Sequence, residues 1–68
     1  MLLADYRKER FLSRNYVARL LGISDFVMFK IENGEIPLSE TQIEKLSFLY
    51  DLPEDIIATA ETHLHRNS

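Results

Sequence analysis

The three residues Gly22-Ile23-Ser24 separate two short stretches with helical spacing, and this tight connection limits the folds open to the chain. The stretch before it, residues 13–21, has an apolar stripe formed by Val17, Leu20 and Leu21. Gly22 can end that helix because glycine takes a left-handed backbone conformation at little cost. Ser24 can cap the next helix through its hydroxyl. Because Ala18 is small, we predict two closely packed helices that cross steeply around a turn of about three residues.

Similar signals predict helices along the rest of the chain. The expected helices cover residues 2–10, 13–21, 24–33, 39–50 and 53–64, with N-caps at Ser13, Ser24 and Ser39. Gln42 completes a capping box with Ser39, and Asn33-Gly34 is a stop signal. The residues expected to face inward in the last three helices are Val27, Met28, Ile31, Ile43, Leu46, Leu49, Tyr50, Ile56, Ile57, Ala60 and Leu64. No segment has the alternation of a strand, so the sequence predicts one all-α domain of five helices over residues 1–68.

The composition narrows the class of protein further. The 68 residues suffice for one domain, and the absence of cysteine excludes disulfides and thiolate metal sites. No apolar run approaches the roughly 20 residues that span a bilayer. The first residues become charged too soon for a signal peptide. We therefore expect a cytoplasmic protein that makes no membrane contact.

Metal sites and catalytic sites are not indicated by the sequence. His63 and His65 are two residues apart and do not share a helix face, so we expect no metal site there. The chain has no glycine-rich phosphate loop and no plausible Ser-His-Asp set. We expect neither an enzyme nor a cofactor.

The net charge of -3 is unevenly distributed along the chain. Residues 1–34 contain six Lys or Arg and four Asp or Glu, which gives this half a net charge of +2. Residues 35–68 contain two basic and seven acidic residues, for a net charge of -5. A surface that faces phosphates needs local positive charge rather than a positive total. The first half is therefore the candidate for a nucleic-acid contact.

The residues around the predicted turn also carry a family resemblance. The matching residues are Leu3, Tyr6-Arg7, Leu12-Ser13, Val17-Ala18, Leu21-Gly22-Ile23-Ser24, Ile31-Glu32-Asn33-Gly34, Leu46, Tyr50, Leu52-Pro53 and Asp55-Ile56. Over residues 3–57 the chain resembles the lambda-repressor/Cro-like helix-turn-helix domain, also called the XRE family. The resemblance implies that the second and third helices, at about 13–33, bind DNA. It also implies an ion pair between Arg7 and Glu32, and a bacterial or phage transcription repressor or autoregulator.

The candidate DNA-binding residues lie on the second and third predicted helices. They are Ser13, Arg14, Asn15, Asp25, Phe26, Phe29, Lys30 and Asn33. Residues 13–15 would hold the phosphate backbone through free amides and the helix dipole. In the major groove, Asp25 could accept from a cytosine amine and Phe29 could touch a thymine methyl. This chain departs from the family in having Arg14 where glutamine is usual, and in its two phenylalanines.

The expected partner is double-stranded DNA with an inverted-repeat operator. One module touches few base pairs, so the sequence predicts a homodimer on half-sites about 34 Å apart. The candidate dimer residues are Leu49, Leu52, Ile57 and Leu64, from the last predicted helix and the region before it.

Phe26 and Phe29 leave a second interpretation open. They could contact bases or sugars, form a patch for a protein partner, or belong to the core if the helical register is different. In the second case the chain is a protein-binding module, such as an antirepressor or an accessory subunit, because aromatic residues are enriched in protein interfaces.

Overall fold

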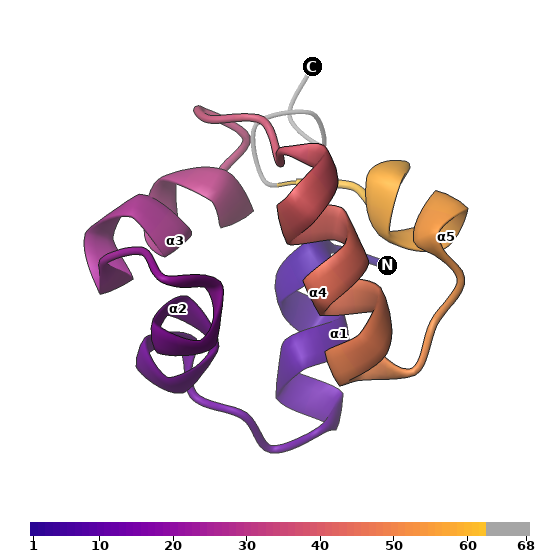
Figure 1. The fold of residues 1–68 in the computed structure, drawn as a ribbon, viewed down its shortest axis with the longest axis horizontal. Helices are drawn as coiled ribbons and strands as arrows, with labels where there is room; N and C mark the ends of the chain where they lie inside the picture. The colour runs from indigo at the N-terminus through magenta and orange to yellow at the C-terminus, as the bar shows by residue number, and fades with distance from the viewer. Residues whose placement is uncertain (63–68) are drawn as a thin grey trace.

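The computed structural model describes residues 1–62, and these residues form five helices (Figure 1). The helices are α1 (Leu3–Glu9), α2 (Arg14–Leu21), α3 (Asp25–Glu32), α4 (Glu40–Tyr50) and α5 (Glu54–Ala58). The one extended pairing in residues 1–62 is an isolated bridge between Leu2 and Glu61. The prediction of an all-α chain with five helices is therefore confirmed. None of the described helices is both long and apolar enough to cross a membrane.

The three serine caps predicted from the sequence are present. Ser13 and Ser24 each accept, through Oγ, a hydrogen bond of 3.1 Å from the amide three residues further on. Ser39 accepts in the same way from the Gln42 amide at 3.2 Å, and the Gln42 side chain accepts from the Ser39 amide at 2.9 Å. The predicted capping box is thus confirmed. These bonds fix the starts of α2, α3 and α4 because they satisfy amides that have no partner inside the helix.

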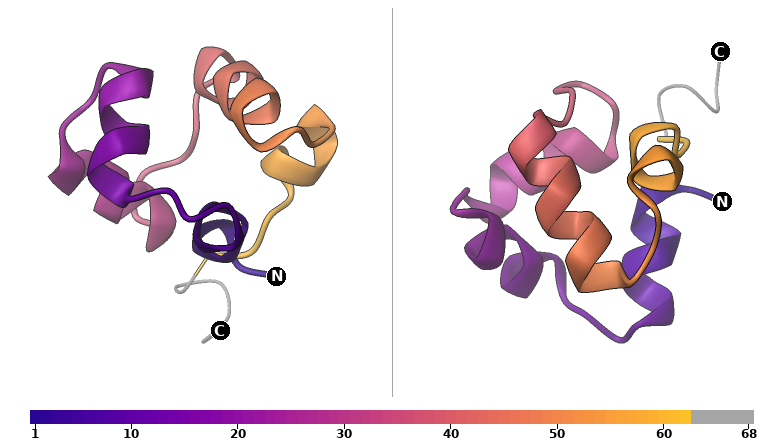
Figure 2. Two further views of the ribbon diagram at one scale, coloured as in Figure 1. Left: turned by 90° about the horizontal axis from the view of Figure 1, so that it is seen from below. Right: turned by 45° about the vertical axis from the view of Figure 1, so that its right-hand side comes forward.

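The helices are arranged as two pairs with α1 beside them. α2 packs against α3, and α4 packs against α5. The left view of Figure 2 shows α1 end-on, below the gap that separates the two pairs. Residues from four helices share one core, which contains Val17, Ala18, Leu21, Met28, Leu46, Tyr50 and Ile57. This shared core holds the α2–α3 pair in place against the rest of the chain.

The prediction of a last helix over residues 53–64 is wrong in its length, because α5 ends at Ala58. Beyond that point the chain runs beside the start of α1, and the Leu3 amide donates to the Glu61 carbonyl at 2.7 Å. Glu61 pairs with Leu2 in an isolated bridge and does not continue the helix, so Ala60 does not lie on a helix face. The remainder of the predicted helix lies outside the described residues, and with it His63, Leu64 and His65.

Two residues that were predicted to face inward are instead exposed. Leu20 on α2 and Ile56 on α5 both lie at the surface, while Leu21 and Ile57 beside them are buried. Val27 on α3 is half-buried. These corrections have a common reason. The helices have only five to eight residues, and the face that each one buries is too narrow to include all of its apolar side chains.

A buried ion pair joins α1 to the end of α3, as the family resemblance implies. Arg7 Nε donates to Glu32 Oε2 at 2.8 Å, and Arg7 Nη2 donates to Glu32 Oε1 at 3.2 Å. A third nitrogen, Nη1, donates to the carbonyl of Leu12 at 2.9 Å. Both charged side chains are buried. The predicted pair is therefore confirmed, and it fixes the position of α3 without facing solvent.

The Tyr50 hydroxyl is buried and has no hydrogen-bond partner within residues 1–62. Burial raises the pKa of this phenol further above neutral pH than its ordinary value, so the buried group is a neutral O–H donor. Because an unpaired buried polar group costs roughly 1–3 kcal/mol, Tyr50→Phe is expected to raise the free energy of unfolding by about 1 kcal/mol. Urea unfolding followed by circular dichroism measures the change, with the exposed Tyr16→Phe as an unchanged control. A loss of stability in Tyr50→Phe would contradict the prediction.

Candidate nucleic-acid interface

The connection between α2 and α3 has the conformation predicted from the sequence. Gly22 has a φ of +73°, in the left-handed region that side chains rarely adopt. The Ile23 amide donates to the carbonyl of Ala18 at 3.0 Å, which closes the end of α2. Ala18 is fully buried, and Ile23 packs against the core. The turn therefore holds α3 close to α2 with one face on the core and the other face exposed.

The first turn of α2 offers amides that the helix itself does not use. The first helical hydrogen bond runs from the Val17 amide to the Ser13 carbonyl at 3.2 Å, and the Ser13 hydroxyl takes the amide of Tyr16. The amides of Arg14 and Asn15 therefore point out of the helix end. Ser13 and Asn15 are exposed. Such an end, with its positive dipole, suits an anionic group such as a phosphate.

Arg14 and Asp25, which were expected to contact DNA separately, are bound to each other. Arg14 Nε donates to Asp25 Oδ1 at 3.0 Å, and Arg14 Nη2 donates to Asp25 Oδ2 at 2.8 Å. The guanidinium also lies over the Phe29 ring, 5.1 Å from its centroid. The hydrogen bonds from Arg14 lower the pKa of the Asp25 carboxyl, and the same bonds raise the pKa of the guanidinium. Asp25 thus competes with any phosphate or base for the donors of Arg14.

Phe26 and Lys30 form a second pair on the exposed side of α3. The Lys30 ammonium lies 4.8 Å from the centroid of the Phe26 ring. The Phe26 side chain is 62% exposed, and Phe29 is also exposed. The interpretation of these two phenylalanines as core residues is therefore wrong. The exposed face of α3 instead presents two aromatic rings, each with a cation above it.

Asn33 ends α3, as predicted, and Gly34 after it takes a left-handed φ of +83°. Asn33 lies eight residues after Asp25, which corresponds to about 12 Å along a helix axis. The structure therefore brings together Arg14, Asp25 and Phe29, and it places Phe26 and Lys30 beside them on α3. It does not bring Asn33 to this cluster.

Comparisons with protein-family models, curated proteins and solved structures gave no match to this chain.

The expected dimer surface needs correction. Ile57 is 1% exposed and belongs to the core, so it cannot contact a second chain. Leu49 and Leu52 are half-buried and pack against that core. Leu64, the fourth residue of the expected surface, lies outside the described residues. α5 has only five residues with which to face α4, and Ile57 is the one that it buries.

Two exposed phenylalanines were missed by the sequence interpretation. Phe48 on α4 is 90% exposed, and Phe11 between α1 and α2 is 96% exposed. Phe48 lies two residues after the buried Leu46 and two before the buried Tyr50. At about 100° per residue, that spacing directs its side chain to the opposite side of α4. The helical pattern of the sequence was therefore enough to identify Phe48 as exposed.

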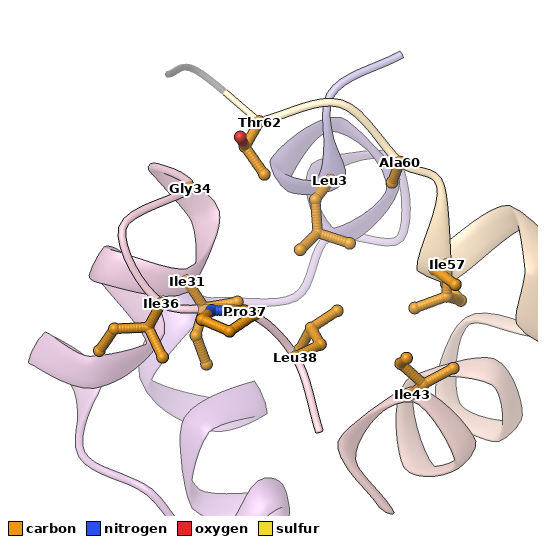
Figure 3. A pocket seen from close by; sticks show the side chains of 11 residues that line it. Leu3, Ile31, Gly34, Ile36, Pro37, Leu38, Ile43, Ile57, Ala60 and Thr62 are labelled. Atoms are coloured by element: carbon orange, nitrogen blue, oxygen red, sulfur yellow. The ribbon is translucent and has the colours of Figure 1, made fainter. Parts of the chain in front are cut away.

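An apolar hollow of about 250 Å³ lies among α1, the loop after α3, α4 and α5 (Figure 3). Figure 3 shows Leu3, Leu38 and Ile57 converging on it. Within residues 1–62, its lining contains no charged residue, and the one hydroxyl there belongs to Thr62.

Proposed function

We propose that this protein is a sequence-specific DNA-binding regulator, most simply a repressor, with α2 and α3 as its helix-turn-helix. One observation carries the proposal: a three-residue turn holds α3 against α2 with its outer face exposed, next to the unused amides at the start of α2. An exposed helix held in this way fits a major groove about 12 Å wide. The chain would then act by occluding a promoter.

Each part of this surface has a role in the proposal. The amides of Arg14 and Asn15 would hold a phosphate, with the hydroxyl of Ser13 kept as the helix cap. Lys30 would reach a phosphate or a guanine edge, and the rings of Phe26 and Phe29 would contact thymine methyl groups or sugars. Because phosphate contacts position the protein and base contacts select the sequence, α3 would supply the specificity.

The direct test is a selection from random DNA followed by fluorescence anisotropy over a salt series. We expect a selected inverted repeat that binds more tightly than random DNA by at least about 1,000-fold, with an affinity that falls steeply with salt. Lys30→Ala and Arg14→Ala should weaken binding without unfolding the protein. Lys8→Ala, which removes an exposed lysine of α1 outside the α2–α3 pair, is the matched control. A selection that enriches no sequence would reject the proposal.

Asp25→Asn is expected to raise the affinity for DNA by about tenfold at low salt, because it frees Arg14 and removes a negative charge from the surface that meets phosphates. The slope of the logarithm of the affinity against the logarithm of the salt concentration should become steeper, by the amount expected for about one more phosphate contact. Anisotropy with the selected DNA measures both quantities. Asp55→Asn is the matched control, since Asp55 is an exposed aspartate in the first turn of α5. A lower affinity for Asp25→Asn would mean that Asp25 itself contacts a base.

A protein-binding module is the second candidate, and one observation favours it. Arg14 is held by Asp25, while Phe26 and Phe29 are exposed on the same surface. Exposed aromatic rings are typical of the centre of a protein interface. The two candidates differ in the effect of Phe26→Ala with Phe29→Ala. If these changes abolish capture of a specific protein while the wild-type chain selects no DNA, the second candidate is correct.

A further inference from the structure

An apolar surface groove lies between α2 and α4, outside the candidate DNA interface. Its walls are Leu20 and Leu21 of α2, with Glu44, Lys45, Phe48 and Leu49 of α4. Its volume is about 460 Å³. Two of the residues in these walls, Leu20 and Phe48, are large, apolar and exposed. Exposed apolar side chains that gather beside a recess are a feature of interaction sites, so the groove is a candidate interface.

We propose that this groove is the surface through which two copies of the chain form a two-fold symmetric dimer, with Phe48 of each copy inserted in the groove of the other. The proposal deepens the proposed function and rests on it for the expectation of a dimer. The groove keeps Leu49 from the expected dimer surface and leaves out the buried Ile57.

The first reason for a second copy as the occupant is the shape of the patch. A two-fold interface must be complementary to itself, so the same surface has to supply both a protruding group and a recess that receives it. Here Phe48 is 90% exposed and protrudes at the edge of a recess that its own helix helps to form. If the Phe48 ring of each copy inserts in the groove of the other, the dimer buries Phe48 and Leu20 of both copies.

The second reason is the charge on the rim. Glu44 and Lys45 are neighbours on α4 with opposite charges, and they are the two charged residues among those that line the groove. Under a two-fold rotation, residue i of one copy faces residue j of the other, and j faces i. Glu44 of each copy can therefore pair with Lys45 of the other copy, which gives two ion pairs in the dimer. DNA is a poor occupant in comparison, because an apolar groove with no net charge does not attract phosphates.

The groove and the candidate DNA interface share no residue. The groove uses the last turn of α2 and the exposed side of α4, whereas the DNA interface uses the first turn of α2 and the outer face of α3. The right view of Figure 2 shows α4 facing the viewer with α2 beside it, apart from α3 behind. Both surfaces can therefore be occupied in the same complex.

The test is sedimentation velocity on the full chain without DNA, from about 1 μM to 1 mM. We expect a concentration-dependent shift from monomer to dimer. Phe48→Glu should raise the dimer Kd at least about 100-fold, because one substitution removes the inserted ring from both halves of the interface. Phe11→Glu is the matched control, since Phe11 is equally exposed but does not line the groove. Far-UV circular dichroism establishes that each variant is folded.

A charge exchange tests the two-fold arrangement itself. Glu44→Lys should weaken the dimer by placing like charges together twice, and Glu44→Lys combined with Lys45→Glu should restore it. A chain that stays monomeric at 1 mM, or a Phe48→Glu variant that dimerises as the wild type does, would overturn the proposal. The proposal would also be overturned if the double variant Glu44→Lys with Lys45→Glu dimerises as weakly as Glu44→Lys alone. Since no DNA is present, these outcomes are independent of the DNA selection above.

Discussion

Glu32→Ala is expected to lower the free energy of unfolding by about 3–5 kcal/mol, because it leaves the Arg7 guanidinium charged and buried without its partner. Arg7 gives Glu32 two hydrogen bonds, at 2.8 and 3.2 Å, and both side chains are buried. A domain of this size has a total stability of roughly 3–10 kcal/mol. We therefore expect a large fraction of the variant to be unfolded at 37 °C.

Thermal and urea unfolding followed by circular dichroism measure this effect. Glu35→Ala is the matched control, since Glu35 is an exposed glutamate three residues further on. The double variant Arg7→Met with Glu32→Leu should be more stable than Glu32→Ala alone, because it removes the unpaired charge together with its partner. A Glu32→Ala protein that unfolds within a few degrees of the wild type would show that the pair contributes little.

Ile57→Ala is expected to lower the free energy of unfolding by about 2–5 kcal/mol, which is the usual cost of removing a large aliphatic side chain from a packed core. Ile57 is 1% exposed and lies in the cluster that contains Met28, Leu46 and Tyr50. The loss combines the transfer free energy of three carbon atoms with the cavity that they leave. The same substitution would have a small effect on folding if Ile57 were a dimer contact on the surface.

The adjacent Ile56→Ala is the control for this measurement, because it makes the same chemical change at a position that is 36% exposed. We expect it to cost less than about 1 kcal/mol. Urea denaturation of the two variants at equal concentration gives the comparison. Equal losses at positions 56 and 57 would mean that α5 is not seated on the core as described.

Much of the fold was predictable because its signals are local. Each serine cap acts on an amide three residues away, and the Gly22 turn closes through a hydrogen bond from Ile23 to Ala18. These interactions depend on neighbours in the sequence, so their residue types identify them. The Arg7–Glu32 pair spans 25 residues and was expected from the family resemblance, not from any local pattern. DNA binding and dimer formation stay predictions.

The sequence by itself determined where the first four helices begin and end, and the left-handed turn at Gly22. Only the tertiary structure decided the end of α5, the burial of Ile57 in place of Ile56, and the pairing of Arg14 with Asp25. The physical reason is the range of the interactions. The hydrogen bond from the Leu3 amide to the Glu61 carbonyl joins two segments that are far apart in the sequence, and the packing of α2 on α3 sets Arg14 beside a carboxylate eleven residues away. Such contacts exist only once distant segments have met.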